Sequence, residues 1–170
     1  MKQVSKKKPV VKKRTVKKKA VRPHPKYGTS KLEEDFARDF LDKLGFKYIY
    51  QFEAKEIGRF YDFCILLKEE DGLIPGNIIL IEIDGGYYHS DPRVVDENKL
   101  NPMQKHNKRV DEHKNKWALM HGIPLIRIWE KDIREKPSKV LEALKKILYA
   151  ADNRAILTEK KNKRHINKIK

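Results

Sequence analysis

The spacing of apolar residues along the first half of the chain predicts one helix followed by three strands. Apolar positions three and four apart predict a helix over residues 30–44, which ends at Gly45. Residues 47–54 and 59–67 are rich in aromatic and β-branched side chains and are separated by a short turn, which predicts a hairpin. Residues 77–84 are almost continuously Ile and Leu, so we expect this strand to be central in a sheet.

The second half of the chain predicts a helix over residues 103–121, a strand over 123–130 and a helix over 137–150. The expected apolar stripe of the first of these helices consists of Met103, Val110, Trp117 and Met120. A strand, a crossover helix and a further strand imply a parallel pair that is covered by helices. We therefore expect an α/β domain over residues 27–152, in the order helix, three strands, crossover helix, strand, helix.

Positive charge is concentrated at the two ends of this 170-residue chain, whose formal net charge is +16. Residues 1–26 contain 12 Lys and Arg and no acidic residue, and residues 153–170 contain 7 Lys and Arg against one acidic residue. Residues 27–152 contain 21 basic against 23 acidic residues, so the expected domain is slightly acidic. Segments of such high charge and low apolar content cannot bury enough surface to order themselves, so we expect two disordered basic tails.

The N-terminal arm, residues 1–26, is expected to contact phosphates and to gain affinity for nucleic acid by counterion release. The alternatives are that the arm is a solubilising or localisation tail, or that it binds an anionic membrane surface. The arm has no amphipathic apolar face, which argues against membrane binding. We therefore expect a nucleic-acid partner and no membrane. The expected phosphate-binding residues are Lys6, Lys7, Lys8, Lys12, Lys13, Arg14, Lys17, Lys18 and Lys19.

The single cysteine, Cys64, excludes an internal disulfide framework and is expected to be a buried thiol in a reducing compartment. The sequence contains no apolar run long enough for a membrane span and no secretory signal. We therefore expect a cytoplasmic protein of a bacterium or of a phage-infected cell, or one associated with a virion.

Three carboxylates are expected at the ends of the central strands. Asp62 interrupts an aromatic strand, and Glu82 and Asp84 share one face of the next strand because strand side chains alternate. Converging carboxylates repel each other unless a cation lies between them, and oxygen ligands favour Mg²⁺ or Mn²⁺. The alternative is that each acid pairs separately with a Lys or Arg.

Four short motifs, in this order, resemble the PD-(D/E)XK nuclease superfamily. They are Glu33 on the first helix, Asp62 on the second strand, "IEIDGGYYH" at residues 81–89 and "GIPLIRIWEKDI" at residues 122–133. Over residues 27–133 the chain is similar in particular to the very-short-patch-repair (Vsr-like) and DUF559-type endonucleases. The resemblance implies a restriction-endonuclease-like core, which agrees with the expected order of elements.

The resemblance also implies roles for individual residues. Asp62 and Glu82 match the metal-binding acids of the superfamily, and Glu33 resembles the first-helix acid that supports the metal site. Asp84 lies where the best-known motif has lysine, so the chain departs from that pattern, and we expect Asp84 to complete the metal site. His89 has the spacing of the Vsr-like active-site histidine and is expected to act as a general acid or to orient water.

Two basic residues of the second half are further candidates. Lys114 lies between Val110 and Trp117 on the predicted apolar stripe, so it either replaces the missing motif lysine or extends to solvent. Asp111, one turn earlier, is expected to pair with Lys114 or to orient it. Arg127 faces away from its aliphatic strand neighbours and is expected to approach a phosphate.

Together these features predict a Mg²⁺-dependent (or Mn²⁺-dependent) DNA endonuclease whose basic tails hold it on its substrate. The main alternative is a non-catalytic nucleic-acid-binding, virion or nucleoprotein component that retains the nuclease fold. An RNA-processing nuclease is a third interpretation. A small free-standing enzyme of this kind is typical of bacteriophages and mobile elements, which is an implication of the resemblance alone.

Overall fold

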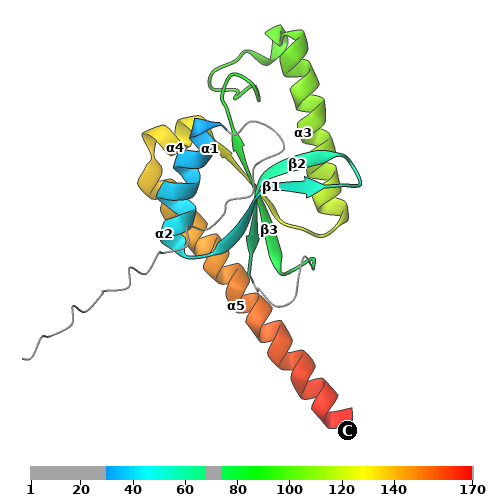
Figure 1. Ribbon diagram of the computed structural model, residues 1–170. Coiled ribbons are helices and arrows are strands. Elements are labelled where there is room, and N and C mark those ends of the chain that lie inside the picture. The colour runs from blue at the N-terminus through cyan, green and yellow to red at the C-terminus, as the bar shows by residue number, and fades with distance from the viewer. Residues whose placement is uncertain (1–29, 68–73, 170) are drawn as a thin grey trace, which may run out of the picture.

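The computed structural model describes residues 30–67 and 74–169, which form an α/β fold with one four-stranded sheet between helices (Figure 1). The predicted arm over residues 1–26 lies outside the described residues. In chain order the elements are α1 (Lys31–Phe36), the π-helical turn η1 (Ala37–Leu41), α2 (Asp42–Leu44), β1 (Lys47–Ala54), β2 (Arg59–Leu66), β3 (Ile78–Asp84), the 3₁₀ turn η2 (Glu97–Lys99), α3 (Pro102–Met120), β4 (Leu125–Trp129), α4 (Glu130–Glu135) and α5 (Pro137–Ile169).

The sheet has the order β1-β2-β3-β4. Strands β1, β2 and β3 pair antiparallel, and β3 pairs parallel with β4, which the chain reaches through α3. These pairings confirm the predicted hairpin and the predicted parallel crossover. All seven residues of β3 are buried, which confirms the predicted central strand. The carboxyl ends of β3 and β4 lie together because their register pairs Asp84 with Trp129.

Each face of the sheet has its own apolar core. Helices α1, α2 and α5 cover one face, and α3 covers the other (Figure 1). The core on the α1 and α5 face includes Phe36, Leu41, Phe63, Ile65, Ile81, Leu144 and Leu148. The core on the α3 face includes Tyr61, Cys64, Ile78, Leu80, Ala118 and Ile123. Cys64 is fully buried, as predicted, and burial raises the pKa of its thiol to about 12.

The predicted apolar stripe of α3 is wrong at its two ends and holds in the middle, where Val110 and Trp117 are half-buried and Trp117 packs against the core on this face. Met103 and Met120 are 39% and 73% exposed, whereas the buried residues of this helix are Gln104, Lys114 and Ala118. The reason lies in the sheet, whose α3 face changes from apolar to acidic where β3 reaches Glu82. A polar stripe on α3 therefore packs against this end of the sheet.

The C-terminal part of the chain differs from the prediction in two ways. The last strand ends at Trp129, and residues 130–135 form the short helix α4, which we did not predict. The predicted disordered tail over residues 153–170 is also wrong, because α5 continues to Ile169 and extends away from the sheet (Figure 1). Residues 138–169 contain no Gly or Pro and many Ala, Leu and Lys, which favour helix. Among the described helices, none is both long and apolar enough to cross a membrane.

Candidate active site

Asp62 lies at the point where β2 separates from β3. The ladder between these strands ends at the pair Phe63–Ile81. Two residues further along β3, the Ile83 N–H donates instead to Asp62 Oδ2 at 2.7 Å. The carboxylate therefore replaces a backbone acceptor at the end of the ladder. This hydrogen bond places Asp62 beside the acidic end of β3.

A local change in the hairpin accompanies this arrangement. Gln51, which lies opposite Asp62 in the β1–β2 register, has a φ of +55°, in the left-handed region. On one side of Gln51, Tyr50 packs on the α1 face of the sheet, whereas Phe52 on the other side packs on the α3 face. In a regular strand both would share one face, so the hairpin changes faces at the position that carries Asp62.

Glu82 and Lys114 form a buried ion pair. Lys114 Nζ lies 2.5 Å from Glu82 Oε1, and the two residues are 7% and 3% exposed. The ammonium also lies 4.9 Å from the ring centroid of Tyr61, whose hydroxyl donates to the Lys114 carbonyl at 2.7 Å. The expectation that Lys114 extends to solvent is therefore wrong, and its side chain reaches the third-strand acid.

Glu33 completes a group of four side chains that we call the carboxylate–lysine cluster (Glu33, Asp62, Glu82 and Lys114). Ser30 caps α1, and its hydroxyl donates to Glu33 Oε1 at 2.7 Å. Glu33 Oε2 accepts from Tyr50 Oη at 2.8 Å and from Gln51 Nε2 at 3.2 Å. The same Gln51 that marks the change of face thus also orients the first-helix acid.

Electrostatics in this cluster favour a bound cation. Burial raises the pKa of Asp62 well above its usual value, and the charges of Glu82 and Glu33 raise it further, against the Ile83 amide and Lys114. Burial also raises the pKa of Glu82, which Lys114 and Arg127 partly offset. Two adjacent carboxyl groups that resist ionisation form a donor set in which a divalent cation would stabilise the ionised form.

Asp62 and Glu82 are the residues of this cluster that could hold a hard divalent ion. Their donors are all oxygens, they belong to adjacent strands, and Glu33 lies near enough for its charge to act on Asp62. Oxygen-only donors suit Mg²⁺ or Mn²⁺ rather than zinc.

Asp84 belongs to a second group, the arginine cluster (Asp84, His89, Asp111 and Arg127). Its two oxygens accept from Arg127 Nε at 2.7 Å and Nη2 at 2.5 Å, and Asp84 is 2% exposed. The predicted alternative, separate pairing of each acid with a basic residue, is thus realised for Glu82 and Asp84. Asp84 would join a metal site only by releasing this bidentate partner.

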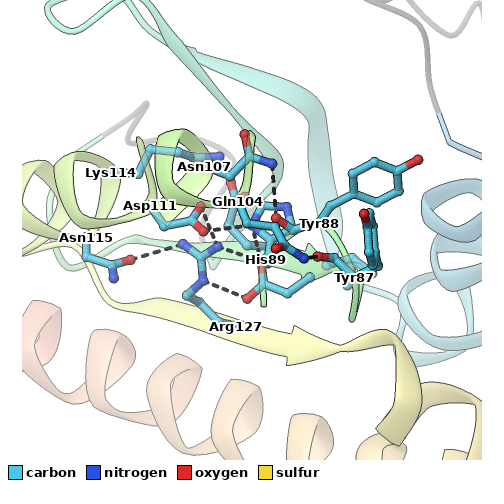
Figure 2. Close-up of polar contacts among 12 residues, drawn as sticks. Tyr87, Tyr88, His89, Gln104, Asn107, Asp111, Lys114, Asn115 and Arg127 are labelled. Carbon is cyan, nitrogen blue, oxygen red and sulfur yellow. Dashed lines mark hydrogen bonds and ion pairs between the residues drawn. The ribbon is translucent and has the colours of Figure 1, made fainter. Parts of the chain in front are cut away.

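Asp111 connects His89 to the same arginine (Figure 2). Its Oδ2 lies 2.7 Å from His89 Nδ1, and its Oδ1 accepts from Arg127 Nη2 at 2.8 Å. Burial lowers the pKa of His89, but the hydrogen bond to Asp111 and the charges of Asp111 and Asp84 outweigh this, so the pKa is raised. Burial raises the pKa of Asp111, but His89 and Arg127 outweigh it, so the net direction is downward. The expected pairing of Asp111 with Lys114 is wrong.

Arg127 has little capacity left for a phosphate. Besides Asp84 and Asp111, its Nη1 donates to Asn115 Oδ1 at 3.2 Å, and its side chain is 21% exposed. Its predicted contact with nucleic acid would require donors that these partners occupy.

The loop after β3 is held in place by α3. Gln104 Nε2 donates to the Tyr87 carbonyl at 2.8 Å, and Asn107 Nδ2 donates to the Tyr88 carbonyl at 3.0 Å. The two tyrosine rings are 55% and 58% exposed, and Figure 2 shows them directed away from the polar network. The loop that carries His89 is thus anchored and presents two aromatic rings to solvent.

Sequence reasoning selected Asp111 and Lys114 on α3 but missed Gln104 and Asn107 of the same polar face. Gln104, Asn107, Asp111 and Lys114 recur three or four residues apart and all point to the sheet end or to the loop after β3. This spacing was visible in the sequence as a helical stripe of hydrogen-bonding residues. Apolar periodicity alone selected Met103 and Met120, which are exposed, and passed over Gln104, which is buried.

Comparison with known proteins adds no relative. No protein-family model, no curated protein and no solved structure matches this chain. The functional conclusion therefore depends on the two clusters themselves.

Proposed function

We propose that this protein is a metal-dependent endonuclease that hydrolyses phosphodiester bonds of DNA, with a restriction-endonuclease-like core. The observation that carries the proposal is the convergence of Asp62, Glu82 and Lys114 at the end of the central strands. Two oxygen donors and one ammonium, contributed by three separate elements, are the groups that phosphodiester hydrolysis requires: metal ligands and a fixed positive charge.

Asp62 and Glu82 would hold the Mg²⁺ or Mn²⁺ ion, with Glu33 supporting Asp62 from α1. When bound, such an ion lowers the pKa of water and polarises a phosphoryl oxygen. Lys114 supplies the cation that the motif lacks at Asp84, because its ammonium reaches Glu82 from α3. There it can stabilise the negative charge that develops on the phosphate.

His89 is the proposed general acid. Its raised pKa keeps the imidazole protonated to a higher pH than that of a free histidine, so it can give a proton to the leaving oxygen. Tyr87 and Tyr88, exposed on the same anchored loop, would contact bases next to the scissile phosphate. The N-terminal arm over residues 1–26 would add sequence-independent affinity for the DNA backbone.

A non-catalytic nucleic-acid-binding protein, such as a virion or nucleoprotein component, is the second candidate, and one observation favours it. Lys114 and Arg127 already neutralise Glu82 and Asp84, so these two acids reach charge balance without a metal ion. Such a protein would bind DNA or RNA through its basic segments and leave the strand intact.

Cleavage of supercoiled plasmid by the full-length protein distinguishes the two candidates. We expect nicked or linear product with Mg²⁺ or Mn²⁺, none with EDTA, and a loss of several orders of magnitude in rate for Asp62→Asn. The matched control is Glu112→Gln, which neutralises an exposed acid of α3 and should leave cleavage unchanged. Plasmid binding without cleavage in either metal would support the non-catalytic candidate, and a single-stranded RNA substrate in parallel tests the RNA interpretation.

A further inference from the structure

The arginine cluster has the donor set of a transition-metal site, but it contains a guanidinium. One carboxylate oxygen each of Asp84 and Asp111 and one ring nitrogen of His89 lie within 4.8 Å of one another. Two carboxylates and an imidazole are ligands that zinc, cobalt and manganese accept. Arg127 Nη2 lies 2.5 Å from Asp84 Oδ1 and 2.8 Å from Asp111 Oδ1, so the positive charge of the cluster comes from the chain itself.

Strand register explains why an arginine occupies this position. The parallel pairing of β3 with β4 places Arg127 opposite Glu82, which lies two residues before Asp84 on β3. From there the guanidinium lies between Asp84 on β3 and Asp111 on α3. Burial lowers the pKa of Arg127, but the two carboxylates raise it by more, so the net direction is upward. A side chain that is four-fifths buried and bonded to three partners is fixed in position.

We propose that Arg127 is the resident cation of the arginine cluster, and that it excludes a transition-metal ion from Asp84, Asp111 and His89. The protein then takes its divalent ion at Asp62 and Glu82 alone, and His89 keeps its hydrogen bond to Asp111 instead of becoming a metal ligand. Only the assignment of the first ion to Asp62 and Glu82 rests on the proposed function. The exclusion itself rests on the contacts of Arg127.

Removal of the guanidinium should therefore expose a three-ligand site. Arg127→Met keeps a side chain of similar length but leaves the two carboxylates without their cation, a situation that a metal ion relieves. Arg127→Lys keeps a positive charge and is the matched control, in which the site should stay closed.

Co²⁺ binding to full-length protein in an Asp62→Asn background tests this, because that background lacks the first ion's principal ligand. With Arg127 present, we expect the imidazole proton signals of His89 in NMR to be unaffected by Co²⁺. With Arg127→Met, we expect one Co²⁺ ion that shifts or broadens these signals. The affinity for Co²⁺, followed by the visible absorption of the bound ion, should fall more than about 10-fold on adding His89→Ala. Circular dichroism establishes that each variant is folded, and Arg127→Gln replaces Arg127→Met if the latter is not.

Two results would overturn the proposal. One is a change of the His89 signals on adding Co²⁺ at the same concentrations while Arg127 is intact. If neither the Met nor the Gln variant of Arg127 folds, this measurement alone decides whether the proposal holds. The other is a folded Arg127→Met or Arg127→Gln protein with no His89-dependent binding. Plasmid cleavage does not enter this test, so a failure of the proposed nuclease function would be seen separately.

Discussion

Replacement of Lys114 by Met should destabilise the protein strongly, because it leaves Glu82 buried without its cation. Both residues are less than one-tenth exposed and their charged atoms lie 2.5 Å apart. Breaking a buried pair by removing one partner costs about 3–5 kcal/mol. For a chain of this size that corresponds to a decrease in Tm of about 6–20 °C.

The same structure predicts how the loss can be repaired. Glu82→Gln neutralises the orphaned carboxylate, so Lys114→Met combined with Glu82→Gln should return to within about 1–2 kcal/mol of the wild-type protein. Urea denaturation at pH 7 in EDTA, followed by circular dichroism, measures the four proteins of this double-mutant cycle. The matched control is Lys116→Met on the exposed side of α3, which should change the unfolding free energy by less than about 0.5 kcal/mol.

The reasoning would be refuted if Lys114→Met cost no more than Lys116→Met. It would also be refuted if Glu82→Gln brought no recovery in the Lys114→Met background. Either result would mean that the ammonium and carboxylate are solvated in solution rather than paired in the interior.

Three further predictions concern the same region and the arm. The raised pKa of Asp62 means that the folded state holds a proton that the unfolded state has lost, so this residue reduces metal-free stability as pH rises from about 4 through the folded pKa. Asp62→Asn should therefore gain stability over the wild type with rising pH in urea titrations, and a constant difference would contradict the burial of this group. Asp111→Asn should lower the pKa of His89 in an NMR titration, and an unchanged value would exclude their pairing. Deletion of residues 1–26 should weaken DNA binding and flatten its salt dependence in fluorescence anisotropy while low-salt nicking persists; an unchanged slope would show that the arm does not contact phosphates.

The sequence by itself determined most of the elements, since their signals are local. The first helix with its end at Gly45, the apolar run of β3 and the crossover between β3 and β4 each depend on residues close together in the chain, and the structure contains all of them. The prediction for the C-terminal segment was wrong because it used the net charge of residues 153–170 and not their local helix propensity. The helix-forming composition of residues 153–169 indicated the continuation of α5.

Only the tertiary structure decided which charged groups meet. The sequence placed Asp62, Glu82 and Asp84 at strand ends, but it could not say that Lys114 from α3 reaches Glu82 while Arg127 from β4 takes Asp84. Those pairings depend on strand register and on which face of α3 turns inward. The sheet is acidic at that end, so burial there selects hydrogen-bonding partners rather than apolar ones. Apolar periodicity therefore misses a buried polar residue such as Gln104 and selects exposed ones such as Met103 and Met120.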